Sequence, residues 1–110
     1  MKYFVMDKER KNTVYHEFQK GKFDGKTFWK EDSVFLSDDI LFTSGMEKLF
    51  SDTVSGYKSY SESEIDIELW NNIKRKARDI GGEVYECVSE ADEWVRNTFV
   101  EYDVFTVIGV

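Results

Sequence analysis

The side chains of this chain that could support catalysis are one histidine, one cysteine and many carboxylates. His16 is the only histidine and Cys87 the only cysteine, so a Ser-His-Asp or Cys-His arrangement would have to include one of them. No G-x-S-x-G nucleophile motif is present. His16 shares one face of a predicted strand with Val14 and Phe18. We therefore interpret His16 as a hydrogen-bonded sheet residue and Cys87 as a buried structural thiol.

The carboxylates show no metal-binding spacing. One Cys and one His cannot form a zinc site without carboxylates, and neither the zinc spacing nor the calcium-loop pattern is present. Glu62, Glu64, Asp66 and Glu68 alternate along a predicted helix, which would spread them around its axis. The glycines form neither G-x-G-x-x-G nor a phosphate-binding loop. The sequence thus predicts no catalytic residue, no metal and no cofactor.

The charge balance limits the class of partner. The chain has 110 residues, a length typical of one domain, with 15 basic against 22 acidic residues and a net charge of −7. This charge argues against nucleic acid as the main ligand and suits either solubility or docking to a basic protein partner. The basic cluster Lys74, Arg75, Lys76 and Arg78 is interpreted as a solvated helix end that complements the helix dipole. A single cysteine, and no apolar run long enough for a signal or a membrane span, predict a cytoplasmic protein without membrane contact.

Local patterns predict the elements that position these residues. The run 104–110 is apolar and β-branched, which is typical of a strand buried on both faces. Tyr3–Met6 and Thr13–Phe18 are predicted to form a hairpin, and 27–29 and 34–36 further strands, so that the first third is an antiparallel meander. Ser37 and Ser44 are predicted helix starts, the latter in a capping box with Glu47.

The second half is predicted as helix, strand, helix and strand. A helix is expected from Ser61 to Ile80, with an apolar stripe and a cap at Ser61. Glu83–Val88 is predicted as a strand, followed by a helix from Ser89 and the closing strand, which together would make a parallel βαβ unit. The predicted fold is a single α+β domain over residues 1–110: a mixed sheet with an N-terminal antiparallel meander, two to three helices and a C-terminal βαβ unit.

Aromatic residues beside carboxylates suggest a binding surface. The segment 56–61 combines Gly, Tyr and Ser, a composition typical of protein-binding loops. Tyr next to carboxylates suits an interface with a basic protein, although such rings could equally cover the ends of a small core. The residues predicted to bind a partner are Asp38, Asp39, Tyr57, Tyr60, Glu62 and Glu64.

A family resemblance points in the same direction. This acidic, aromatic-rich, proline-free chain, with Asp24-Gly25-Lys26-Thr27-Phe28-Trp29 followed by Ser33-Val34-Phe35-Leu36, resembles the immunity proteins of bacterial polymorphic and contact-dependent toxin systems. The resemblance implies a tight protein–protein interface that occludes a cognate toxin domain, often a basic nuclease, and implies no chemistry of its own.

Two other functions are compatible with the same residues. A small enzyme or ligand-binding domain would use His16 and a nearby carboxylate in a pocket where the meander meets the helices. An acidic adaptor subunit of a larger complex would use the same surface as an inhibitor and differ only in its partner. Homo-oligomers are also possible, because an edge strand could pair with a second copy.

Overall fold

The closing apolar run forms β5 (Val104–Ile108), an interior strand of a five-stranded sheet, as predicted. The computed structural model describes residues 1–110. The strand order is β1-β3-β2-β5-β4, and every neighbouring pair is antiparallel. The other strands are β1 (Phe4–Val5), β2 (Tyr15–Lys20), β3 (Val34–Ser37) and β4 (Glu62–Asp66).

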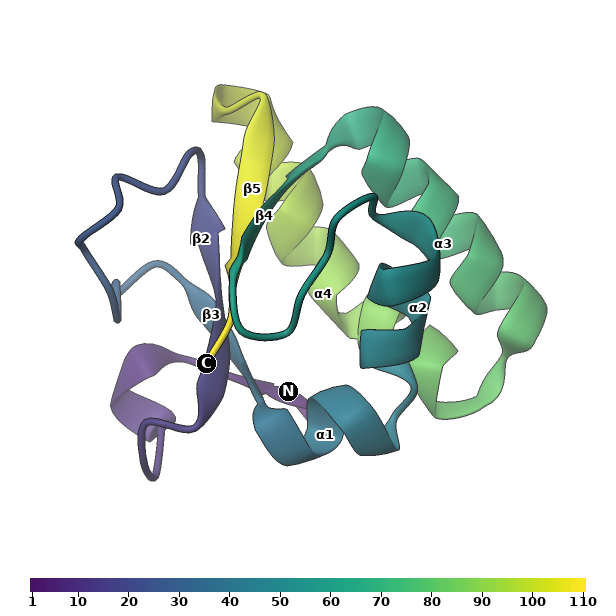
Figure 1. Ribbon diagram of the computed structural model, residues 1–110, viewed down its shortest axis with the longest axis horizontal. Coiled ribbons are helices and arrows are strands. Elements are labelled where there is room, and N and C mark those ends of the chain that lie inside the picture. The colour runs from purple at the N-terminus through teal and green to yellow at the C-terminus, as the bar shows by residue number, and fades with distance from the viewer.

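All four α-helices cover the same face of the sheet (Figure 1). Phe18 of β2 and Phe105 of β5 stack in the core beneath the helices, with ring centroids 5.7 Å apart. Trp70 packs edge-on against Phe105 at 5.6 Å. The predicted α+β class and single domain are confirmed. The helices are α1 (Asp38–Thr43), α2 (Met46–Thr53), α3 (Ile67–Ile80) and α4 (Gly82–Glu101).

The opposite face of the sheet is covered by loops rather than helices. Figure 1 shows the N-terminal segment, which includes a short 3-10 helix (Asp7–Glu9), and the 21–33 segment on this outer side. Arg10 lies 3.9 Å from the centre of the Trp29 ring, and Trp29 stacks on Phe35 at 5.7 Å. Beneath the 21–33 segment, Glu17 is buried and accepts hydrogen bonds from the N–H groups of Trp29 (2.8 Å) and Lys30 (2.9 Å).

The N-terminal strands pair differently from the prediction. The expected hairpin is wrong, because β1 pairs with β3, which also pairs with β2 and so lies between them. The 27–29 segment is not a strand, since the polar groups of β2 hold it as a loop over the sheet. The helix start at Ser37 is confirmed, with its side chain accepting the Ile40 N–H at 3.2 Å. The helix expected from Ser44 begins one residue later, with Gly45 as its N-cap.

The second half contains the largest corrections. Residues 62–66 form β4, not the first turns of a helix, and α3 begins at Ile67 with Asp66 as its cap. The predicted strand at Glu83–Val88 is wrong, since α4 runs unbroken from Gly82. The mixed sheet and the parallel βαβ unit are therefore also wrong. The physical reason is that Val84, Val88 and Ala91 are spaced for one helical face and bury it against the core.

Candidate functional site

His16 lies inside the protein and not in an open pocket. Its side chain is fully buried, and Nε2 lies 2.8 Å from Oδ1 of Asp38 at the first turn of α1. Its other ring nitrogen, Nδ1, is buried without a hydrogen-bond partner. The hydrogen-bonded sheet histidine is as expected from the sequence. An enzyme based on His16 would need this side chain to line an accessible concave site. His16 does not do so, because its side chain is buried.

The six residues predicted to bind a partner fall on three separate elements. Asp39 is exposed on α1, while Asp38 is half-buried by its bond to His16. Tyr57 is buried against Phe50 in the segment after α2. Burial raises the pKa of Tyr57 to about 12, and the nearby charges of Glu47 and Asp38 add to the shift. Tyr57 is therefore a core residue in this structure, and its ring is not presented to a partner.

Tyr60, Glu62 and Glu64 remain on the surface, at the β4 edge of the sheet. Tyr60 is 70% exposed, and both carboxylates are exposed. Glu62 lies opposite Ile108 and Glu64 opposite Thr106 in the β4–β5 register. Ile65 of the same strand is buried in the core beneath the helices. Because side chains alternate along a strand, Glu62 and Glu64 project from the opposite, outer face of the sheet.

The main chain of β4 has an unpaired side. Gly109 N–H donates to the Ser61 carbonyl at 3.0 Å, and in antiparallel pairs hydrogen-bonded and non-bonded positions alternate. The N–H and C=O groups of Glu62 and Glu64 therefore point away from β5. No group outside the sheet bonds to them. We call this side of β4, with Glu62 and Glu64, the acidic edge.

The other edge of the sheet is closed. β1 has only two residues, and the carboxylate of Glu90 on α4 accepts the N–H groups of Lys2, Tyr3 and Phe4 at 2.8 to 2.9 Å. A short strand whose donors are already bound has little left to pair with an added strand. Only the acidic edge is open to such pairing.

A small apolar cavity lies beside the acidic edge on the outer face. Its volume is about 100 Å³, and its apolar lining comes from Tyr15, Phe28, Trp29, Ile108 and Val110. Phe28 and Val110 are about half exposed at its rim. Since Ile108 is the register partner of Glu62, an apolar anchoring site and a carboxylate stand next to each other on one surface.

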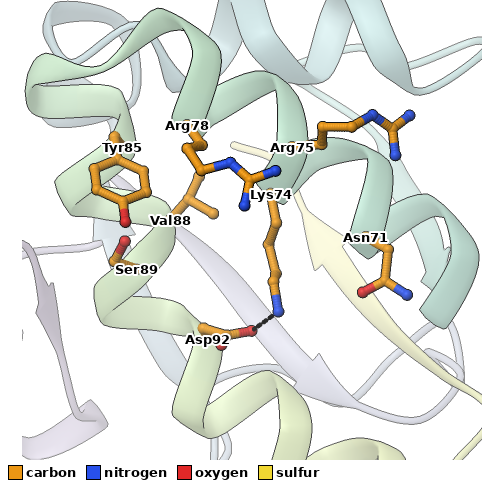
Figure 2. A pocket seen from close by; sticks show the side chains of 8 residues that line it. All are labelled: Asn71, Lys74, Arg75, Arg78, Tyr85, Val88, Ser89 and Asp92. Carbon is orange, nitrogen blue, oxygen red and sulfur yellow. Dashed lines mark ion pairs between the residues drawn. The ribbon is translucent and has the colours of Figure 1, made fainter.

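A second, basic cavity opens between α3 and α4. We call it the α3–α4 cleft (Figure 2). It has a volume of about 370 Å³. Lys74, Arg75 and Arg78 of α3 line one side, and on α4 the hydroxyl-bearing Tyr85 and Ser89 line the other, above Val88. The predicted basic cluster at the end of α3 thus contributes three of its four side chains to one cavity.

Asp92 forms the polar floor of the α3–α4 cleft. Its Oδ1 lies 3.2 Å from Lys74 Nζ and accepts the Trp70 indole N–H at 2.8 Å, while Oδ2 lies 3.1 Å from Arg96 Nε. Partial burial disfavours the charge, but the bonds from Trp70 and Lys74 and the Arg96 charge outweigh it. The pKa of Asp92 consequently lies below its ordinary value. The carboxylate is ionised and fixed.

The remaining chemical groups show no further site. Cys87 is buried, which raises its thiol pKa to about 12. No three His, Cys, Asp or Glu side chains lie close enough to hold a metal ion. No helix has the length and apolar character needed to cross a bilayer. Comparisons with protein-family models, with curated proteins and with solved structures find no match to this chain.

The sequence predicts part of this geometry. The charge of Glu62 and Glu64 indicates exposed positions, but the helix expected there is wrong because both residues lie on β4. The basic cluster is predicted to be solvated, whereas Lys74, Arg75 and Arg78 line the cleft; their i, i+1, i+4 spacing puts Lys74 and Arg78 on one helical face. The facing hydroxyls of Tyr85 and Ser89 have the same i, i+4 spacing. This shared helical face of Tyr85 and Ser89 is not predicted, because residues 83–88 are expected to form a strand.

Proposed function

We propose that this protein is a non-enzymatic protein-binding module: an immunity-type inhibitor that neutralises a basic bacterial toxin domain by covering it. The observation that carries the proposal is the acidic edge, an open strand that joins unpaired main-chain groups to two exposed carboxylates. The resemblance of the sequence to immunity proteins and the net charge of −7 support the same function.

The acidic edge suits an extended basic segment of the partner. Such a segment would add to β4 as a sixth strand, and its main chain would satisfy the outward groups of Glu62 and Glu64. Lys or Arg side chains directly across the new pair would face the two carboxylates, a favourable cross-strand arrangement. Complementary charge would also accelerate association and select against acidic partners.

The apolar cavity beside Ile108 extends the same surface. Interfaces concentrate their binding energy in a few apolar or aromatic anchors surrounded by polar residues. A partner side chain placed in the cavity would contact Phe28 and Val110 while the neighbouring strand pairs with β4. The interface would then combine an anchor, a strand pairing and charge complementarity on the outer face of the sheet, away from the four helices.

Growth rescue tests the function directly. The C-terminal domain encoded by the neighbouring upstream reading frame is expressed with and without this protein, and toxicity that is relieved only on co-expression supports immunity. If the neighbour is harmless, or toxic in both cases, the immunity function is refuted. Capture of a complex from native lysate without any toxin would instead favour the adaptor function.

The acidic edge is tested by paired variants in the same assay. Glu64→Pro removes an outward N–H and blocks an added strand, whereas proline is tolerated on the free side of an edge strand. Glu64→Ala removes the carboxylate but keeps the main-chain donor. We expect Glu64→Pro to weaken the complex, and therefore the rescue of growth, much more than Glu64→Ala does. Equal rescue by the two variants would exclude strand addition.

Charge reversal completes the test. Glu62→Lys with Glu64→Lys should slow association and reduce its salt dependence. The matched control reverses Glu93 and Glu101, two exposed acidic residues of α4, and therefore changes the net charge equally. If both double variants slow association to the same extent, net charge and not the acidic edge controls the encounter.

A further inference from the structure

The α3–α4 cleft has a charge opposite to that of the molecule. Its lining carries three cations, Lys74, Arg75 and Arg78, and one carboxylate, Asp92, in a chain of net charge −7. The Arg78 side chain takes part in no ion pair or hydrogen bond, although acidic residues outnumber basic ones. We propose that this cleft binds a small organic phosphate, whose phosphate group contacts Arg78 and whose hydroxylated remainder contacts Asp92.

The donors that surround Arg78 fit a phosphate group. Figure 2 shows the Arg78 guanidinium and the Lys74 ammonium directed into the space between the helices, with the hydroxyls of Tyr85 and Ser89 close together on the facing helix. A guanidinium binds phosphate oxygens through two parallel N–H bonds. Hydroxyl groups supply further donors in whatever orientation the oxygens require. Donors from both helices thus line the same cavity.

Asp92 indicates which chemical groups the ligand carries besides its phosphate. Its carboxylate is held by Lys74, Trp70 and Arg96, so its position in the cleft is fixed before any ligand arrives. Inorganic phosphate could donate to this carboxylate only through a P–O–H of the same group that contacts Arg78. A sugar or ribose hydroxyl attached to the phosphate can donate to it, so the site favours a phosphate monoester of a polyhydroxylated compound over free phosphate.

The volume of the α3–α4 cleft agrees with a small phosphate monoester as its ligand. A volume of about 370 Å³ falls at the lower end of the range for small-molecule sites, roughly 300–1,000 Å³. That space accommodates a sugar phosphate or a nucleoside monophosphate. The apolar surface of Val88 and the exposed ring of Tyr85 provide a floor against which a sugar or base can pack.

The test is calorimetric titration of the full chain at physiological ionic strength. Three probes are compared: glucose 6-phosphate, adenosine 5′-monophosphate and inorganic phosphate. We expect one-to-one binding of at least one ester, tighter than that of inorganic phosphate. Arg78→Gln should weaken the ester by about tenfold, the usual effect of losing a charged hydrogen bond. Asp92→Asn should reduce the preference for the ester over inorganic phosphate.

Lys76→Gln is the matched control, because Lys76 is exposed on α3 and does not line the cleft. It removes the same charge from the same helix and should leave binding unchanged. Equal losses for Lys76→Gln and Arg78→Gln would show a general charge effect and overturn the proposal. So would equal affinity for inorganic phosphate, or no ester binding at millimolar concentration. Lys76 and Arg78 are both exposed, and an amide NMR spectrum of each variant tests whether it is folded.

Discussion

Glu17 offers the most direct test of the energetics of this fold. It is 2% exposed, and its carboxylate accepts three hydrogen bonds from the 21–33 segment. These come from Trp29 N–H at 2.8 Å, Lys30 N–H at 2.9 Å and Ser33 Oγ at 2.7 Å. The segment contributes Phe28 and Trp29 to the apolar cavity. Glu17 thus connects the stability of the outer face to the proposed interface.

Glu17→Gln changes one acceptor oxygen into a donor. The amide oxygen retains at best two of the three bonds, and the new N–H₂ group then faces a main-chain N–H. A lost bond to a charged acceptor costs about 1.5–3 kcal/mol, and a buried unsatisfied donor costs about 1–3 kcal/mol more. Burying a neutral amide in place of an ion offsets part of this cost. We therefore expect a net loss of about 2–4 kcal/mol in the free energy of unfolding.

Urea unfolding followed by tryptophan fluorescence measures this loss. Glu64→Gln, the same change at an exposed strand position, is the control and should remain within about 0.5 kcal/mol of the wild type. Ser33→Ala removes only one of the three bonds to the carboxylate and should cost about 1.5–3 kcal/mol. A Glu17→Gln variant as stable as Glu64→Gln would refute the account of Glu17 as the anchor of the 21–33 segment.

Two further predictions concern Asp92 and Gly109. The pKa of Asp92 lies below its ordinary value of 3.8, so its ionised form stabilises the fold at neutral pH. Urea unfolding should show Asp92→Asn less stable than the wild type at pH 7, with a difference that shrinks as the pH falls below 3.8 and disappears below the folded-state pKa; a difference that stays constant below pH 3.8 would contradict this. A Cβ at Gly109 would lie 2.2 Å from the Ser59 carbonyl oxygen, so Gly109→Ala should cost about 3 kcal/mol or more by displacing the segment before β4. A cost below about 1 kcal/mol by the same measurement would show that this segment adjusts freely.

The elements that the sequence predicted correctly are those whose signal is local. The β-branched run at 104–110 has too many apolar residues for a half-exposed strand, and β5 is buried on both faces. Ser37 caps α1, because its hydroxyl oxygen accepts the Ile40 N–H. In both cases the residues themselves supply the determining interaction, namely burial of apolar surface or a hydrogen bond within four residues.

The errors arose where a distant partner decides the structure. Glu62–Asp66 has the acidic composition of a helix start, but it pairs with β5, whose register partners lie 38 to 46 residues later in the sequence. β3 separates β1 from β2 because Leu36 pairs with both Phe4 and His16. The 83–88 error was avoidable, since its apolar spacing continues without a break into the following helix.

The candidate sites also combine features that local sequence predicts with features that contacts between distant segments determine. The charge of Glu62 and Glu64 predicts that both residues lie on the surface. Their exposed main chain follows from the strand order, which local sequence patterns do not predict. Tyr57 was selected for its composition, and the packing of Phe50 places it in the core. The α3–α4 cleft requires two helices side by side, and the second was predicted to begin at Ser89, after Tyr85.

The acidic edge and the α3–α4 cleft are joined by a single helix, which determines how they influence each other. β4 leads directly into α3, and about twelve residues separate Asp66 from Arg78, a distance of roughly 18 Å along the helix axis. At physiological ionic strength the screening length is about 8 Å. The carboxylates of the edge therefore contribute little to the potential at Arg78, and a basic partner on β4 should not displace a phosphate from the cleft.

At low ionic strength the same separation gives the opposite expectation. The screening length rises to about 30 Å at 0.01 M salt, so the charges of Glu62 and Glu64 then reach the cleft and oppose an incoming phosphate. Reversing them should strengthen phosphate binding at low salt and leave it unchanged at physiological salt. The strand-addition proposal and the phosphate proposal can consequently fail separately at physiological salt, where each experiment reports on its own surface.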